Sequence, residues 1–289
     1  MRRISVAVAA TLLLCVLAGH AWAEEAGKPE WTVRTWGAYQ GRADVEDDRG
    51  SMAESRAGVE AAWRWFTLAY EARSFDFEDP ARLPFGNGQE PFDTLHALSL
   101  SAQQGGALGG RWSWFGGASL DSGFEEEMDG SLSGSVRGGV GYALAEDATL
   151  RLGAAASVSP LGARGLPVLA LAVNRKAEAG WSALVGVPST EVRYRWGGRF
   201  ATRAALSLDD GTWRLADDSP MRRKGYFSES GLTAGLYQDV DLTEAVFASL
   251  GLTWSFRRSL EVYNDEGDKS GEWDLDPALG AVLHIGIRF

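Results

Sequence analysis

The sequence predicts an all-β chain that closes into a transmembrane, antiparallel, up-and-down β-barrel of 12 to 14 strands. Three observations predict this fold: apolar and polar residues alternate with a period of two along many segments, the links between these segments alternate between long and short, and the last segment alternates and ends on an aromatic residue. A period of two puts successive side chains on opposite faces of a strand. A barrel wall with lipid outside and a polar interior needs this pattern.

The first 23 residues are typical of a secretory signal peptide. Arg2 and Arg3 give a positive start, an apolar run extends to Ala18, and a small-residue A-W-A cleavage site ends at Ala23. Cys15, the only cysteine, lies in the apolar run and follows a leucine, so neither lipidation nor a disulfide is expected. We expect residues 1–23 to be removed and residues 24–289 to form one barrel domain.

The composition excludes several classes of protein. A formal net charge of −11 argues against nucleic acid as a partner. After the signal peptide no run of about 18 apolar residues remains, so a transmembrane helix is excluded on length. The 12 tryptophans and 36 glycines suit neither a helical bundle nor a disordered segment. Many alternating strands would accommodate both.

Alternation is clearest between residues 244 and 263. Leu252 and Val262 share the apolar face, with Arg258 as a charged exception, while Thr253 and Glu261 share the polar face. A period of two over such a run indicates a strand longer than those of soluble proteins. In chain order, strands are expected at residues 31–41, 53–63, 65–77, 92–104, 110–121, 131–144, 148–158, 166–174, 179–187, 190–197, 199–208, 228–238, 244–262 and 276–289.

The links between these strands alternate in length. Long links are expected at residues 41–52, 78–91, 122–130, 160–165, 209–229 and 264–276, with short turns between them. Only the link at residues 189–190 breaks the rule. Membrane barrels place long loops on the outer side and short turns on the periplasmic side, where both termini lie.

The closing segment LHIGIRF resembles the C-terminal strand of Gram-negative outer-membrane proteins, with Ile285, Ile287 and Phe289 on one face. In that family the pattern implies an assembly signal read by the barrel-assembly machinery. The resemblance implies an outer-membrane location, with lipid and lipopolysaccharide as surroundings. The segment GWSALVGVPSTEVRYRW, residues 180–196, is similar to part of a family of outer-membrane barrels that is defined only as a domain of unknown function.

No catalytic arrangement is expected. His96 shares its face with lipid-side leucines and His284 faces the lumen, so a Ser/His or Asp/His pair on one face is not predicted. The sequence contains no G-x-S-x-G motif and no zinc-ligand spacing, so neither a metal nor another cofactor is expected. We therefore expect a protein that is not an enzyme.

Aromatic and acidic residues are expected near the two rims. An interfacial girdle, or alternatively a platform that stacks carbohydrate, is predicted from Trp63, Trp65, Trp112, Trp114, Trp181, Trp196 and Trp254. The acidic clusters lie in the long loops but lack the EF-hand order. They suit a solvated rim, bridged to lipopolysaccharide phosphates through divalent ions.

The residues assigned to the lumen carry the main functional prediction. Charged residues with inward parity are Arg34, Arg56, Arg73, Arg137, Arg151, Arg193, Arg195, Arg203, Arg257 and Arg288, against Glu60, Glu71, Glu191 and Glu261. Arginine-lined pores favour anions. The prediction is a monomeric passive pore or ligand-transfer channel that prefers anions. The alternative is that these arginines pair with carboxylates and fill the lumen, which would leave a non-conducting structural or surface-interaction barrel.

Overall fold

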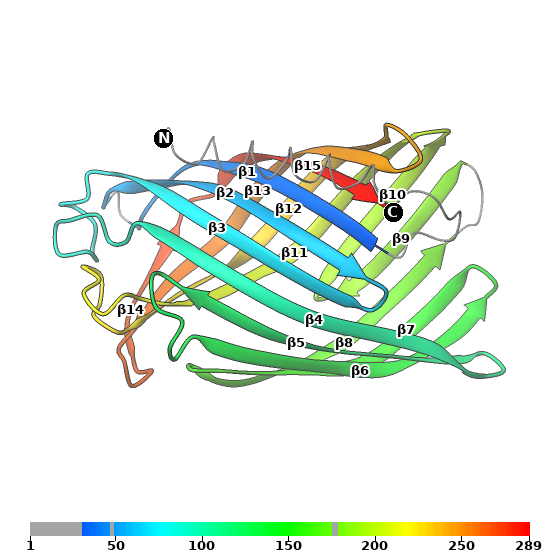
Figure 1. Cartoon of the computed structure of the whole chain (residues 1–289), viewed down its shortest axis with the longest axis horizontal. Coiled ribbons are helices and arrows are strands. Elements are labelled where there is room, and N and C mark those ends of the chain that lie inside the picture. Colours follow the sequence, from blue (N-terminus) through cyan, green and yellow to red (C-terminus); the bar gives the residue numbers. More distant parts are fainter. Residues whose placement is uncertain (1–30, 47–48, 175–178) are drawn as a thin grey trace.

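Fourteen strands close into an antiparallel barrel, which confirms the predicted fold class (Figure 1). The computed structural model describes residues 31–46, 49–174 and 179–289, so the expected signal peptide lies outside the described residues. The strands are β1 (Trp31–Asp44), β2 (Ser51–Trp63), β3 (Phe66–Glu78), β4 (Thr94–Gly109), β5 (Trp112–Phe124), β6 (Leu132–Ala145), β7 (Ala148–Ser159), β8 (Gly162–Asn174), β9 (Gly180–Val187), β10 (Ser189–Gly197), β11 (Phe200–Arg214), β12 (Tyr226–Asp241), β13 (Val246–Tyr263), β14 (Lys269–Leu275) and β15 (Ala278–Arg288). β14 pairs with β13 beyond the end of β15, makes a single bridge from Leu275 to Val45, and is not a separate wall strand. No helix in the described ranges is long and apolar enough to cross a membrane.

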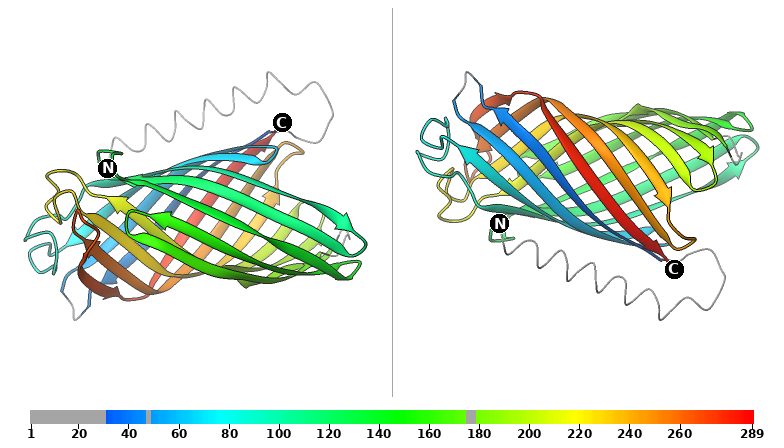
Figure 2. Two further views of the ribbon diagram at one scale, coloured as in Figure 1. Left: turned by 90° about the horizontal axis from the view of Figure 1, so that it is seen from below. Right: turned by 90° about the horizontal axis from the view of Figure 1, so that it is seen from above.

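The last strand closes the barrel. β15 pairs with β1 on one side and with β13 on the other (Figure 2). At the seam, Phe289 N donates to Trp31 O at 3.0 Å, and Trp31 N donates to Phe289 O at 2.8 Å. Such closure is what a membrane requires, because lipid offers no partner to a free backbone group.

Apolar residues cover the outer face of the wall. Leu250, Leu252 and Leu279 are 61%, 69% and 74% exposed, whereas Ser249 and Ser255 on the inner face of β13 are buried. Exposed tryptophans beside the short turns include Trp112 and Trp196, whereas Trp254, expected near a rim, is exposed in the middle of β13. The exposed leucines and tryptophans are placed as a lipid-facing band and its interfacial aromatic residues would be.

Two links are shorter than predicted. Residues 162–165, which were expected in a loop at 160–165, pair with β7 instead. β8 therefore begins at Gly162, and the link after β7 is a tight turn. Only Pro188 separates β9 from β10. β9 and β10 are therefore a short hairpin, and the wall is lower there than at β11 to β13.

A β-bulge corrects the assignment of Arg257 and Glu261 to the lumen. Register shifts between β12 and β13 at this point, and Arg257 adopts a positive φ of 50°. One extra residue reverses the faces of all residues beyond it. Arg258, Leu260 and Val262 therefore point inward and are buried, Glu261 lies on the opposite face, and Arg257 is an exposed bulge residue.

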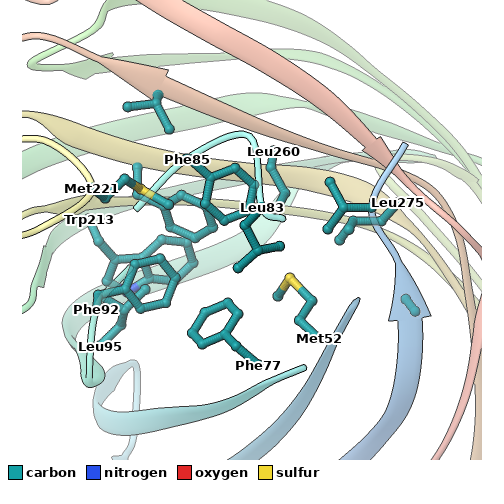
Figure 3. Packing of buried hydrophobic residues seen from close by; sticks show 14 of the residues in the cluster. Met52, Phe77, Leu83, Phe85, Phe92, Leu95, Trp213, Met221, Leu260 and Leu275 are labelled. Carbon is teal, nitrogen blue, oxygen red and sulfur yellow. The ribbon is translucent and has the colours of Figure 1, made fainter. Parts of the chain in front are cut away.

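Buried apolar side chains fill the interior of the long-loop half (Figure 3). We call this set the interior core; it comprises Ala43, Val45, Met52, Phe77, Leu83, Phe85, Phe92, Leu95, Trp213, Leu215, Met221, Phe227, Leu260, Val262, Leu275 and Ala278. Phe92, which follows β3, meets Phe227 of the opposite wall with ring centroids 5.0 Å apart. Side chains from both walls and from two long loops thus meet across the lumen.

The top of β11 leaves the cylinder of the wall and reaches β5. Phe124 of β5 forms a parallel bridge with Arg214 of β11, and Glu125 N donates to Arg214 O at 2.8 Å. Ala216 N donates to Glu125 Oε2, also at 2.8 Å. The long-loop half is therefore a narrower, filled barrel, closed by a β5–β11 junction that bypasses β6 to β10.

Candidate functional site

A cavity rich in arginine opens in the lumen near the short turns. It measures about 270 Å³, and we call it the basic cavity. Its lining is Arg34, Glu191, Arg193, Arg195, Arg199, Phe200, Ala201, Arg203, Asp239, Val240, Asp241, Phe247, Ala248, Ser249, His284 and Arg288. These residues come from β1, β10 to β13, β15 and the turn before β11.

Strand alternation on β10 brings three charged side chains into this cavity. Tyr194 and Trp196 lie on the outer face, where their rings meet at 4.7 Å and Trp196 is 64% exposed. The opposite parity belongs to Glu191, Arg193 and Arg195, and all three line the cavity. The sequence EVRYRW therefore places its charges inside because its apolar and aromatic residues face out.

Several of the arginines are held by carboxylates. Asp239 is the centre of one group, since its Oδ2 lies 3.2 Å from Arg193 Nη2 and 3.5 Å from Arg203 Nε. Ser249 Oγ donates to Asp239 Oδ1 at 2.6 Å. Arg203 also lies 3.4 Å from Glu191 Oε2. These contacts fix the positions of the guanidinium groups on the β10–β12 wall.

The remaining arginines have fewer carboxylate partners. Arg34 makes a two-pronged contact with Glu60, at 3.0 and 2.9 Å, and Arg288 pairs with Asp241 at 3.1 Å. Arg199 donates to a backbone oxygen, and Arg195 has no ion-pair partner within the described part of the chain. Six arginines and three carboxylates line the cavity, so positive charge exceeds negative even when Glu60 is added.

Three polar atoms in the cavity are buried without a partner. They are Nε of Arg34, Nε of Arg193 and Nδ1 of His284, and each lacks a hydrogen bond among the described residues. Buried polar atoms are nearly always satisfied in folded proteins. Two of these atoms are guanidinium donors, so the group that would satisfy them is an acceptor. A carboxylate, phosphate or sulfonate oxygen has the required chemistry.

Arg137 and Arg151 lie outside the basic cavity. Both are exposed on the inner faces of β6 and β7, and Arg137 Nη2 donates to Gln103 Oε1 at 2.8 Å. Ser135 and Ala155 share this inner wall. The exposure of inward-facing arginines shows that the lumen has room on this side.

Arg56, Arg73 and Glu71 belong to a buried ionic network, away from the basic cavity. Arg73 contacts Glu71 through its Nε, and its guanidinium carbon lies 4.5 Å from the centre of the Trp213 ring. Arg56 Nη2 lies 2.7 Å from Glu54 Oε2. The network adjoins the interior core through Trp213, so these arginines pair with carboxylates at that height of the lumen.

The charged residues that the sequence assigns to the lumen do not include four acidic residues that the structure places there. Glu54, Glu229, Asp239 and Asp241 face the interior together with the arginines they bind. Each shares the inward parity of its strand, so the alternation of the sequence contains the signal that places it in the lumen. The interior is therefore less basic than ten arginines to four glutamates implies. Its positive excess is concentrated in the basic cavity.

The described residues offer no obvious metal site. No group of three or more His, Cys, Asp or Glu side chains among them is placed to hold an ion. His96 lies on the outer face and its Nδ1 is 2.8 Å from Tyr70 Oη, whereas His284 lines the basic cavity. The two histidines therefore face opposite sides of the wall.

Comparison with known proteins finds similar barrels among solved structures. No protein-family model and no curated protein matches the chain significantly. An outer-membrane channel from Pseudomonas putida F1 is 8% identical with a TM-score of 0.47, covering 93% of this chain and 98% of its own. The NanC porin is 9% identical with a TM-score of 0.41, covering 89% and 100%. The KdgM porin is 7% identical with a TM-score of 0.39, covering 89% and 99%.

These solved structures are porins and channels, but their identities and TM-scores are too low to carry an argument about this chain. The similarity of residues 180–196 to a particular barrel family stays a prediction, since no family model matches. Any function for this chain must be argued from its own residues.

Proposed function

We propose that the protein is an outer-membrane channel that binds anionic solutes in its basic cavity and passes them without catalysis. The observation that carries this proposal is the coincidence, in one cavity of the lumen, of an arginine excess and two buried guanidinium Nε atoms that lack acceptors. Confined positive charge raises the local concentration of anions. Exposed acidic loops act weakly on ions in the lumen, because salt screens them within ~8 to 10 Å.

The proposed location is the outer membrane of a Gram-negative cell. It is supported by the signal-peptide pattern, by the band of exposed leucines on the outer face, and by a closing strand that ends on Phe289. Outer-membrane lipid and the barrel-assembly machinery are the proposed partners. Lipopolysaccharide is proposed to meet the acidic long-loop rim through divalent ions, and the barrel to act as a monomer.

A second candidate function is a non-conducting structural or surface-interaction barrel. The interior core favours it, since buried side chains from opposite walls meet there. This alternative requires that no route connects the basic cavity with the long-loop side. Measured conductance would therefore separate the two functions.

Reversal potentials in planar bilayers under a potassium chloride gradient test the proposal. The wild type should favour chloride, and Arg195→Glu should shift the preference toward potassium. Arg195 suits this test because it has no ion partner in the described ranges, so its loss should not unfold the barrel. Arg111→Glu is the control, because Arg111 lies in the β4–β5 turn at the same rim but outside the cavity. Potassium preference in the wild type would contradict anion binding, and a complete lack of conductance would favour the structural barrel.

A further inference from the structure

The barrel wall has an incomplete stretch between β8 and β11. β9 pairs with β8 only from Leu169 to Asn174, and β10 pairs with β11 only from Phe200 to Ser207. The β9–β10 hairpin ends at Pro188. Beyond it, residues 162–168 of β8 and residues 208–213 of β11 have backbone edges without a ladder partner among the described residues.

These two free edges are long. Six or seven residues at a rise of about 3.3 Å each give edges of roughly 20 Å. Residues 162–167 of β8 are all exposed, as are Leu208 and Asp210 of β11. The exposed residues of these edges are accessible to solvent or lipid, whereas the end of the β11 edge, at Thr212, lies against Gly123 of β5.

The two edges overlap instead of lying side by side. Arg164 is on the inner face of β8 and Asp210 is on the outer face of β11, yet Arg164 Nη1 lies 3.3 Å from Asp210 Oδ2. Tyr226, on the outer face of β12, donates from its hydroxyl to Gly130 O of the β5–β6 link at 3.2 Å. The tops of β6 to β8 thus lie outside the narrower barrel that the β5–β11 junction closes. We call the space between the two layers, which Arg164 and Asp210 span, the slot.

Free strand edges are not stable against hydrocarbon. Unpaired backbone at membrane depth is tolerated only where protein covers it or where it lines a water-filled space. The Arg164–Asp210 pair that crosses the slot is 57% and 56% exposed at its two side chains, so solvent reaches it. Leu166 and Pro167 on one edge and Leu208 on the other are exposed as well. The slot therefore has a wet, charged end and apolar edges.

The slot is continuous with the lumen below it. β11 carries Arg203 in the basic cavity, then Ala205 and Ser207 on the same inner face, and the slot begins at the next residue. From Arg203 to Leu208 the strand rises about 17 Å. Small side chains line this stretch, whereas the straight path along the barrel axis meets the interior core.

We propose that solutes pass between the lumen and the membrane's long-loop side laterally, through the slot between β8 and β11. The solute class that fits is an amphipathic anion, with its acidic group at the basic cavity and its apolar part toward Leu166 and Leu208. This inference rests on the proposed channel function and adds its route and its substrate class.

Lipid-phase quenching tests the slot without any transport measurement. A bimane probe is attached at Leu166→Cys, on the inner face of β8, in vesicles that contain brominated phospholipids. Leu169→Cys on the outer face is the positive control, and Ser119→Cys on the inner face of β5, three strands from β8, is the negative control. The only native cysteine, Cys15, lies in the expected signal peptide and does not interfere. We expect quenching at Leu166 of at least half that at Leu169; quenching as weak as at Ser119 would overturn the slot.

Closing the slot tests the route. Arg164→Cys and Asp210→Cys are joined by a short bifunctional maleimide, and entry of octanesulfonate into vesicles is measured. We chose this anion because it stays charged at working pH. Linkage should lower the flux at least fivefold, while each single variant treated with the reagent should match the wild type. Unchanged flux in the linked protein would overturn the lateral route and leave the channel proposal intact. If even unlinked protein passes no octanesulfonate or chloride, the channel function fails, and the quenching result still decides whether the slot exists.

Discussion

Arg258 donates two hydrogen bonds to Glu229 Oε1, from Nε at 3.0 Å and from Nη2 at 2.7 Å, and both side chains are almost fully buried. The pair exists because the bulge at Arg257 turns Arg258 inward, toward β12 and the interior core. Arg73 Nη1 also lies 3.4 Å from Glu229 Oε2. One carboxylate therefore joins opposite walls of the barrel.

Glu229→Gln should destabilise the barrel by about 3 kcal/mol, because it removes the nearest carboxylate from the buried Arg258 and leaves Glu54 Oε2, 3.9 Å away, as its remaining counter-charge. Denaturant unfolding in lipid vesicles, followed by heat-modifiable gel migration, measures the loss. Asp76→Asn is the control, since Asp76 pairs with Arg42 at 2.8 Å but is 75% exposed. An exposed pair contributes about 0 to 1 kcal/mol. Equal losses of stability in the two variants would show that the buried Arg258–Glu229 pair contributes no more than the exposed Arg42–Asp76 pair.

The sequence predicts the barrel well and its interior less well. Alternation at residues such as Leu250 and Leu252 follows directly from strand geometry, so the strands and the outward face were accessible from sequence. The bulge at Arg257 was not, because one inserted residue has no pattern of its own. The only sign of the bulge in the sequence is Arg258, a charged residue at a position that alternation assigns to the apolar face. Alternation without a bulge assigns Glu261 to the lumen, on the wrong face.

The candidate site was partly predictable for the same reason. Parity brought Arg34, Arg193, Arg195 and Arg203 into one set, and the structure places all four in the basic cavity. Parity gives a face but not a height along the barrel. Arg56 therefore belonged to the same predicted set, although it lies in the buried network near the interior core. The slot depends on which strand edges remain unpaired, and that is a property of the assembled sheet.

Leu152→Arg should impair folding into bilayers, because Leu152 faces outward between Val140 and Leu169 on the neighbouring strands. An arginine at lipid depth costs roughly 2 to 4 kcal/mol near the midplane. The control is Ala155→Arg on the same strand, whose side chain would enter the open side of the lumen opposite Arg137, where a like-charge pair costs at most about 1 kcal/mol. The ratio of folded to unfolded bands on unheated gels measures both. Comparable folding of the two variants would contradict the assigned faces of β7.

Glu125→Gln should change the pH dependence of stability. Glu125 follows β5 at the long-loop end, and burial raises the pKa of its carboxyl, with the hydrogen bond from Ala216 N opposing that rise. A raised folded-state pKa means that the folded protein holds this proton more tightly than the unfolded chain. The contribution is present below about pH 4 and is lost as pH rises through the folded pKa. The wild type should therefore lose stability relative to Glu125→Gln between pH 4 and pH 7, measured by denaturant unfolding at both values. A difference in stability between the two proteins that is the same at pH 4 and at pH 7 would contradict a raised pKa for Glu125.

Phe289→Ala should impair assembly in cells far more than refolding in detergent. The backbone of residue 289 keeps its two hydrogen bonds to Trp31 in this variant, so the seam between β1 and β15 remains. Removing one aromatic side chain at the rim takes away only part of the burial energy of the barrel. If Phe289, with Ile285 and Ile287, forms a signal for the assembly machinery, the larger loss appears only where that machinery acts. The amount of folded protein in outer-membrane fractions is compared with the refolded yield of the purified chain. Deletion of Phe289 serves as the second variant. Because the deletion also removes the seam hydrogen bonds, it should lower both quantities. Equal defects of Phe289→Ala in cells and in detergent would show that the side chain is merely structural.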